Sequence, residues 1–281
     1  MSRIRIVTDS TADLPKELVE KNEITVVPLK VTFQGEEAFL DGVNIDSEQF
    51  YRLLSEKKEI PVTSQPSPSE FAAVYKKLAQ DGYSVISIHI SSKMSGTFQS
   101  AIMGKKMVPG ADIEVIDSKL VSMGLGMVVL EAAIAAKKGK TGREIVQIVN
   151  NLIAKSEVFF FVDTLEYLSR GGRIGKAGAF LGTILNIKPL LCIKDGIVYP
   201  YEKVRGRTKA IERMIQIVEE RFGNRRVKCS LVHGDDPEGL SQLFQKIKTR
   251  LNCGEPVVST AGSVVGTHAG PKVLGIILAH E

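Results

Sequence analysis

The sequence lacks the features of secreted, membrane-spanning and zinc-binding proteins. Its three cysteines, an odd number without CxxC spacing, argue against a disulfide framework and favour a reducing compartment. The longest apolar run, residues 123–136, is interrupted by Glu131 and is shorter than the roughly eighteen residues that cross a bilayer. The N-terminus has no apolar signal segment. These absences predict a cytoplasmic protein.

A strong charge imbalance and the aromatic signatures of RNA-binding domains are also absent. The 37 basic and 32 acidic residues leave a net charge of +5, and the basic residues are spread over predicted helical faces. We therefore expect no nucleic-acid partner. With 43% hydrophobic and 25% charged residues, the composition is that of an ordinary globular protein, and 281 residues favour two domains.

Strand and helix patterns alternate through the first half of the chain. Residues 3–7, 24–33, 84–90 and 112–116 have strand patterns with helical patterns between them, which predicts a parallel sheet in an α/β/α arrangement. After residue 155 a hairpin with Asp195-Gly196 at its turn and several further strands predict an α+β domain with a mixed sheet. We predict an α/β protein with an N-terminal domain of residues 1–155 and a C-terminal domain of residues 156–281.

Three hydroxyl-bearing segments are candidate ligand-binding loops. Residues 61–68 form a predicted irregular loop, pinned by prolines, that contains Thr63. Ser95-Gly96-Thr97 lies where an apolar strand meets a predicted helix, so hydroxyls, backbone N–H groups and the helix dipole point to one place. Gly266-Thr267-His268-Ala269-Gly270-Pro271 puts a histidine in a loop that a ligand can approach closely. Turn and cap roles explain each segment equally well, but together they predict a carboxylate site.

Two other motifs fit cofactor or metal chemistry poorly. Gly139-Lys140-Thr141 ends like a phosphate-binding P-loop, but Ile134 stands where that motif needs glycine. Asp9, Asp13, Asp41 and Asp117 carry carboxylates that suit a metal, yet the first two are predicted helix caps and no His or Cys has ligand spacing with them. We therefore expect neither a metal nor a cofactor.

A stand-alone enzyme is the alternative interpretation of the same residues. Ser95 would be the nucleophile and His268 the base in a reaction on an acyl or phosphorylated small molecule. No G-x-S-x-G elbow surrounds Ser95. His89, in an apolar strand, is predicted to pack in the core.

The candidate segments resemble motifs of the DegV family, bacterial fatty-acid-binding proteins. The resemblance covers essentially the whole chain and implies a two-domain protein that buries one long-chain fatty acid, such as palmitate or stearate. It also implies a carrier without catalytic activity: a separate fatty acid kinase phosphorylates the presented carboxylate to an acyl-phosphate for phospholipid synthesis. The matching segments are Thr8-Asp9-Ser10, Thr63-Ser64-Gln65-Pro66, Ser95-Gly96-Thr97, Asp117-Ser118, Gly171-Gly172-Arg173-Ile174, Ile187-Lys188-Pro189 and Gly266-Thr267-His268-Ala269-Gly270-Pro271.

The resemblance implies roles for individual residues. The threonine matching Thr63 and the serine matching Ser95 hold the carboxylate, and the histidine matching His268 lies close by. Hydroxyls and the amides at a helix N-terminus would replace the water around the carboxylate, so no fixed cation is needed. The further candidates for carboxylate binding are Ser64, Gly96 and Thr97. A tail of about fourteen methylenes, at about 0.8 kcal/mol each, would supply about 11 kcal/mol of affinity.

Partner contacts are expected at basic residues of the second domain. Arginines in a glycine-rich loop and after the hairpin are candidates for docking the kinase or its nucleotide phosphates, although solvated surface is an equally simple role. Contact with a membrane would be at most transient. The docking candidates are Arg170, Arg173, Arg205 and Arg207.

Overall fold

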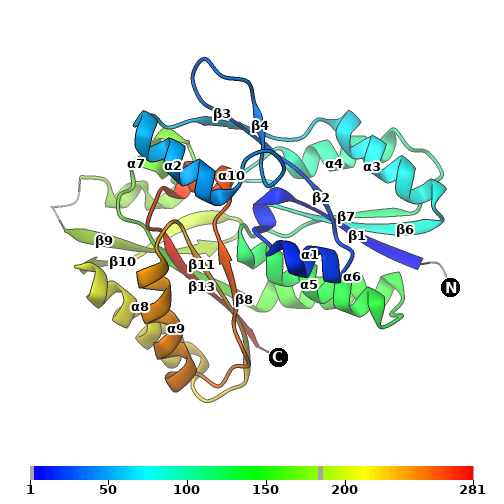
Figure 1. Ribbon diagram of the computed structural model, residues 1–281. Coiled ribbons are helices and arrows are strands. Elements are labelled where there is room, and N and C mark those ends of the chain that lie inside the picture. The colour runs from blue at the N-terminus through cyan, green and yellow to red at the C-terminus, as the bar shows by residue number, and fades with distance from the viewer. Residues whose placement is uncertain (1–2, 183–185, 281) are drawn as a thin grey trace.

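Two sheets form the frame of the protein in the computed structural model, which describes residues 3–182 and 186–280 (Figure 1). The N-terminal sheet has the order β2-β1-β6-β7, and all its neighbouring strands are parallel, as predicted. The carboxyl ends of β1 and β6 therefore share one edge, where a ligand of an α/β sheet is expected. Its strands are β1 (Arg3–Asp9), β2 (Thr25–Val27), β6 (Tyr83–His89) and β7 (Ile113–Asp117).

Helices cover both faces of the N-terminal sheet. Successive residues of a strand point to opposite faces, so Val7 packs against α3 (Pro68–Gln80) and α4 (Thr97–Lys106), whereas Ile6 packs against α5 (Met123–Lys137). The predicted α/β/α arrangement is confirmed. The remaining helices of this half are α1 (Lys16–Lys21), α2 (Ser47–Lys57) and α6 (Gly142–Lys155), with the 3-10 turn η1 (Ser10–Ala12).

The helix α5 is apolar on nearly all sides because it lies between the two sheets. Its Val128 and Val129 belong to the same buried cluster as Ile6 of β1 and Ile277 of the C-terminal sheet. The chain passes directly from α6 into the C-terminal sheet at residue 156, and the core is continuous there. The domain boundary between residues 155 and 156 stays a prediction.

The C-terminal sheet has the order β10-β9-β8-β13-β11-β12 and is mixed, as predicted: β11 and β12 are parallel and the other pairs antiparallel. Asp195 and Gly196 both have positive φ, the conformation of a two-residue hairpin turn, between β9 and β10. Its strands are β8 (Ser156–Phe161), β9 (Ile187–Lys194), β10 (Ile197–Arg205), β11 (Val227–His233), β12 (Val257–Thr260) and β13 (Leu274–His280).

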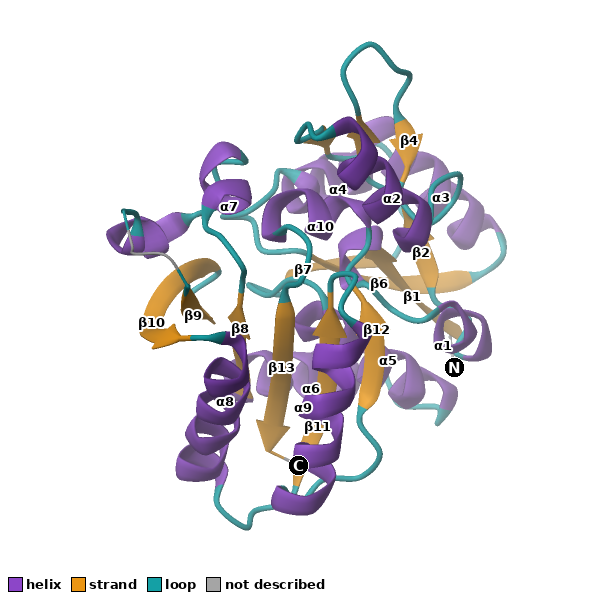
Figure 2. Cartoon of the chain, turned by 60° about the vertical axis from the view of Figure 1, so that its left-hand side comes forward, coloured by secondary structure: helices purple, strands orange, loops and turns teal. Residues whose placement is uncertain are grey.

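Only one face of the C-terminal sheet is covered by its own long helices. Figure 2 shows α8 (Arg207–Phe222) and α9 (Pro237–Arg250) along that face, against Phe159 and Phe161 of β8. The alternate residues Val158 and Phe160 point to the other face, toward the N-terminal half. No helix in the described parts of the chain is long and apolar enough to cross a membrane.

Two sequence predictions are wrong, one in residues 24–33 and one in residues 61–68. Residues 24–33 are not one strand, because Pro28 lacks an N–H and separates β2 from β3 (Lys30–Thr32). Residues 61–68 are not wholly irregular, because the prolines flank rather than interrupt β5 (Val62–Ser64). The strand β3 pairs antiparallel with β5 and with β4 (Phe39–Leu40) in a third, small sheet.

The predicted histidine loop is also wrong. Residues Ser263–Ala269 form a helix, α10, and His268 stands in its last turn. Gly270, with φ 77°, ends the helix, so the glycine and proline of the motif follow the histidine as a helix stop. Two short elements precede the hairpin, α7 (Glu166–Arg170) and the 3-10 turn η2 (Gly175–Phe180).

Candidate functional site

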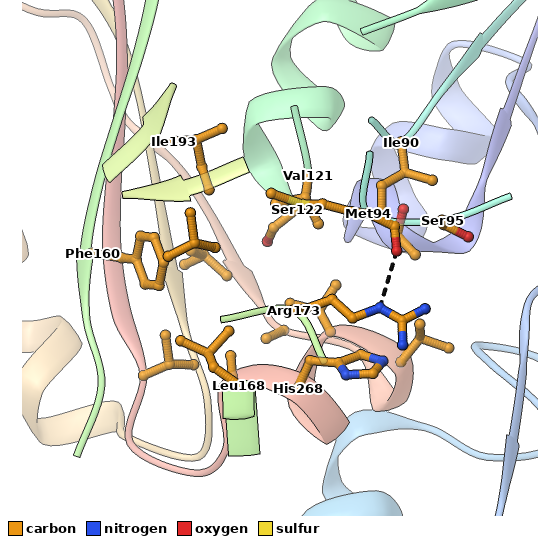
Figure 3. A pocket seen from close by; sticks show the side chains of 18 of the residues that line it. Ile90, Met94, Ser95, Val121, Ser122, Phe160, Leu168, Arg173, Ile193 and His268 are labelled. Atoms are coloured by element: carbon orange, nitrogen blue, oxygen red, sulfur yellow. Dashed lines mark hydrogen bonds between the residues drawn. The ribbon is translucent and has the colours of Figure 1, made fainter. Parts of the chain in front are cut away.

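A cavity of about 300 Å³ lies between the N-terminal and C-terminal sheets (Figure 3). Ile90 and Val121 line it from the N-terminal half, and Phe160 and Ile277 line it from the open face of the C-terminal sheet. Val264 and Val265 of α10 add a third wall. The cavity is therefore apolar over most of its surface, and it requires both halves of the chain.

The polar side chains of the cavity gather at one side. Figure 3 shows Arg173, His268 and Ser95 together, with Phe160 and Ile193 across the cavity from them. Thr63 and Ser64 of β5 belong to the polar side, because Thr63 is hydrogen-bonded to His268. The structure thus brings the predicted Thr63, Ser64, Ser95 and His268 into one site. A site of this form suits a ligand with one polar head and a long apolar tail.

His268 lies in the cavity wall, and only one of its two ring nitrogens is hydrogen-bonded. Its Nε2 lies 2.9 Å from Thr63 Oγ1, whereas Nδ1 is buried and has no hydrogen-bond partner among the described residues. Gly171 packs against the ring so closely that a Cβ there would lie 2.2 Å from Nδ1. Burial, helped by the nearby Arg173 guanidinium, lowers the pKa of His268 to about 4. The ring is therefore neutral at pH 7.

Arg173 lies in the cavity wall. Its Nε donates to the Met94 carbonyl at 3.0 Å, the dashed line in Figure 3, and Nη1 donates to the Gly171 carbonyl at 2.7 Å. Sequence reasoning considered this arginine only for docking and expected a site without a fixed cation. The signal it missed was the Gly171-Gly172 pair: Gly172 has φ 70° and turns the loop back, and Gly171 admits the histidine.

Of the three residues Ser95-Gly96-Thr97, only Ser95 lines the cavity. Ser95 Oγ lies 2.8 Å from Thr97 Oγ1 and accepts a hydrogen bond from the Thr97 N–H, and Thr97 is fully buried. Gly96 is covered by Gln65, whose Oε1 would be 2.4 Å from a Cβ at that position. Gly96 and Thr97 therefore lie behind Ser95 and orient it, and Gln65 joins the polar side of the wall.

The other three candidate docking arginines differ in their environment. Arg170 is exposed and forms an i,i+4 ion pair with Glu166 at 2.7 Å. Arg205, near the end of β10, is exposed. Arg207 is engaged within the fold, because it pairs with Asp163 and Asp236. Two of the four arginines are thus free to meet a partner from the surface.

The enzyme alternative finds little geometric support. No hydrogen bond joins Ser95 to His268 among the described residues, and the imidazole is bonded to Thr63 instead. A nucleophile normally lies within hydrogen-bond reach of its base. Within the described ranges, no group of three or more His, Cys, Asp or Glu side chains has a geometry suited to a metal ion.

A family model described as "Uncharacterised protein, DegV family" matches residues 3–281. This chain belongs to the DegV family. A DegV domain-containing protein of Caldanaerobacter subterraneus is 40% identical over 284 residues, and the match covers both chains completely. The predicted family resemblance is confirmed.

Solved structures of DegV-family proteins have the same fold as this chain. A fatty-acid-binding DegV-family protein from Thermus thermophilus is 36% identical, with a TM-score of 0.93 over 99% of this chain and 100% of the other. A stearic-acid-binding protein from Eubacterium ventriosum is 31% identical, with a TM-score of 0.87 over 100% of this chain and 98% of the other. These likenesses confirm the predicted fold class.

Proposed function

We propose that this protein binds one long-chain fatty acid, such as palmitate or stearate, in the cavity between the two sheets. The observation that supports this most is the division of the cavity into an apolar side and a polar side, found in a chain whose relatives are described as fatty-acid-binding. A long apolar tail of the ligand would lie along Val121, Phe160 and Ile277. Each methylene removed from water contributes about 0.8 kcal/mol, so the tail supplies most of the affinity.

The polar side provides donors for a carboxylate. With its proton on Nε2, the neutral His268 ring donates to Thr63 Oγ1, and the Thr63 hydroxyl is then free to donate to the ligand. Ser95 offers a second hydroxyl, and the Arg173 guanidinium offers a positive charge held in place by two carbonyls. A buried carboxylate is stable when such charged and neutral donors replace its water.

Presentation of the head group to a kinase is the second part of the proposal. The protein would act in the cytoplasm as the acyl-carrying subunit, and a separate kinase would convert the carboxylate to an acyl-phosphate for phospholipid synthesis. The exposed Arg170 and Arg205 are then docking residues for the kinase or its nucleotide, whereas Arg207 is a structural residue. Support for this part comes from the family resemblance and from the exposure of those two side chains.

Extraction of the purified protein with organic solvent, followed by mass spectrometry, tests the binding proposal. We expect one equivalent of a long-chain fatty acid from the wild type and less than one from Ser95→Ala. Turnover of acyl esters without any partner protein would instead support the enzyme alternative. A protein that carries no lipid and takes up no labelled palmitate would contradict the proposal.

Charge reversal tests the docking residues separately. Arg170→Glu and Arg205→Glu should retain bound fatty acid but lose acyl-phosphate formation with the kinase, because like charges replace the docking contacts. Lys16→Glu is the matched control, since the Lys16 side chain is 90% exposed on a different element. Equal turnover for all three variants would remove these arginines from the docking surface.

A further inference from the structure

The helix α10 bridges the two halves of the chain at both of its ends. Its C-terminal end carries His268, which is bonded to Thr63 of β5. Its N-terminal end is bonded to two carboxylates of the N-terminal half: the Gly262 N–H donates to Asp13 Oδ1 at 3.0 Å, and the Ser263 N–H donates to Asp41 Oδ1 at 2.9 Å. The Ser263 hydroxyl adds a third bond to Asp41 Oδ1 at 2.7 Å. These carboxylates satisfy backbone donors that have no partner inside a helix.

One of these carboxylates, Asp13, also holds a strained part of the cavity wall. Ser122, which lines the cavity, has φ 54° and ψ −145°, a conformation close to one that is essentially restricted to glycine. Its hydroxyl donates to Asp13 Oδ2 at 2.5 Å, and its N–H donates to the Thr11 carbonyl at 2.8 Å. Asp13 therefore connects two parts of the cavity wall, Ser122 on one side and α10 on the other.

Asp13 and Asp41 lie close together without a cation. An oxygen of each lies 3.0 Å from the place a Cβ on Gly262 would take, so the two oxygens are at most 6.0 Å apart. Both side chains are more than nine-tenths buried, no ion pair joins either to a basic group in the described residues, and Asp41 Oδ2 has no hydrogen-bond partner there. The titratable groups that face the pair are Asp9 and Tyr51, and Lys16, Glu20 and Asp46 line the adjoining cleft.

Two neighbouring buried carboxylates without a cation cannot both be ionised cheaply. Burial raises the pKa of Asp13 well above its ordinary value, and the Asp41 carboxylate raises it further; burial also raises the pKa of Asp41. A proton on Asp13 Oδ2 would leave Oδ1 as the acceptor for Gly262 and let Oδ2 donate to Ser122. The pair is thus most stable when it retains a proton.

We propose that Asp13 and Asp41 form a proton-retaining carboxylate latch that positions α10, and with it His268, for the head group of the bound ligand. The inference rests on the proposed fatty-acid-binding function. The two aspartates act through α10 and touch no ligand, so they are positioning residues. Loss of the retained proton would set two negative charges against each other at Gly262, loosen the N-terminal end of α10 and disturb the contact between His268 and Thr63.

The test combines amide hydrogen exchange of residues 263–269 with the rate at which labelled palmitate leaves the full-length protein, both from pH 5.5 to 9. In the wild type, exchange corrected for its intrinsic pH dependence and palmitate release should both accelerate as pH rises. Asp13→Asn, which imitates the protonated carboxyl, should stay slow throughout. Asp13→Ala should be about tenfold faster in both measurements at every pH, because the acceptor for Gly262 is lost.

Two further variants keep the test decisive if Asp13→Ala fails to fold. Ser263→Ala removes one donor to Asp41 and only a single oxygen atom from the buried Ser263 side chain, and it should accelerate both measurements by a few fold. Asp46→Asn changes an aspartate of the adjoining cleft that caps α2 and does not touch α10, so it should behave as the wild type.

The outcomes separate the latch from the fatty-acid proposal. Wild-type kinetics in Ser263→Ala, or an Asp13→Asn variant that keeps the wild-type pH dependence, would overturn the latch even if palmitate binds. A protein that takes up no palmitate but still shows faster exchange at residues 263–269 in Asp13→Ala would contradict the proposed function and leave the latch in place.

Discussion

His89 and His268 each lie beside a hydroxyl group, and the two rings differ in how many of their nitrogens are hydrogen-bonded. His89 is fully buried and both its ring nitrogens are bonded, Nδ1 to Asp9 Oδ2 at 2.9 Å and Nε2 to Ser87 Oγ at 2.7 Å. Tyr75 extends this chain with a 2.8 Å contact to Ser87. His268 has only one bonded nitrogen and lies in the wall of a cavity.

The difference distinguishes a histidine with a structural role from the histidine that we propose for ligand binding. The order Asp9–His89–Ser87 is superficially that of a catalytic triad, yet Ser87 is fully buried and none of the three lines the cavity between the two sheets. A buried polar group is normally satisfied within the fold, and an unsatisfied one requires an explanation. Bonding state and access, rather than residue type, therefore favour His268 over His89 as the candidate ligand-binding histidine.

The largest expected effect is the loss of stability on substitution of His89, whose two ring nitrogens are both hydrogen-bonded. His89→Ala should reduce the free energy of unfolding by about 3–5 kcal/mol, because it removes the imidazole partner of the buried Asp9 carboxylate, whose Oδ2 then keeps only the Ile90 N–H, and because it empties a packed site. Urea denaturation of the purified variant measures the loss. A loss below about 1 kcal/mol would show that the chain from Asp9 to Tyr75 is not a structural element.

The next effect concerns the pH dependence of stability at His268. An unfolded histidine has a pKa near 6.5, whereas this one is lowered to about 4, so between these values only the unfolded state takes up the proton. The histidine's contribution is present above about pH 6.5 and is lost as pH falls through this window, a loss of about 3 kcal/mol. The urea midpoint should fall less between pH 7 and pH 4.5 in His268→Gln than in the wild type. An equal fall in the two proteins would contradict the assignment.

Hydroxyl removal at the head-group site should affect binding more than folding. Ser95→Ala and Thr63→Val each remove one hydrogen bond to a charged ligand group, which corresponds to about 10- to 100-fold weaker palmitate binding. Isothermal titration and thermal denaturation measure binding and folding on the same samples. A variant that melts far below the wild type but binds palmitate normally when folded would reverse the assignment.

The smallest effect is expected at the apolar side. Ile193→Val removes one methyl-sized contact from the wall, which should weaken palmitate binding by about 0.8 kcal/mol, roughly fourfold. Competition binding of palmitate against stearate, measured on the wild type and on Ile193→Val, reports the change in palmitate affinity. An effect as large as that of Ser95→Ala would mean that the tail does not lie along this wall.

Local sequence patterns predicted much of this fold. The strand patterns at residues 3–7 and 84–90 and the Asp195-Gly196 hairpin depend on neighbouring residues, and the structure confirms them as β1, β6 and the turn between β9 and β10. The split at Pro28 was missed because a run of β-branched residues on both sides conceals a change of sheet.

The site was predictable only in part, because its geometry depends on distant segments. Thr63, Ser95 and His268 were identified by their motifs, but the pairing of Thr63 with a histidine 205 residues away has no local signal. Arg173 was assigned to the surface because the tight turn that the Gly171-Gly172 pair permits was not recognised in the sequence. The bonds of Asp13 and Asp41 to α10 also join residues more than 200 positions apart.

Carbon-13 NMR of palmitate labelled at its carboxyl carbon tests the central claim most directly. The account predicts one resonance that a water-soluble paramagnetic agent does not broaden and that shifts in Ser95→Ala and Thr63→Val but not in Ser87→Ala. A resonance that the agent broadens, with the same chemical shift in all these proteins, would place the head group in solvent and contradict the account.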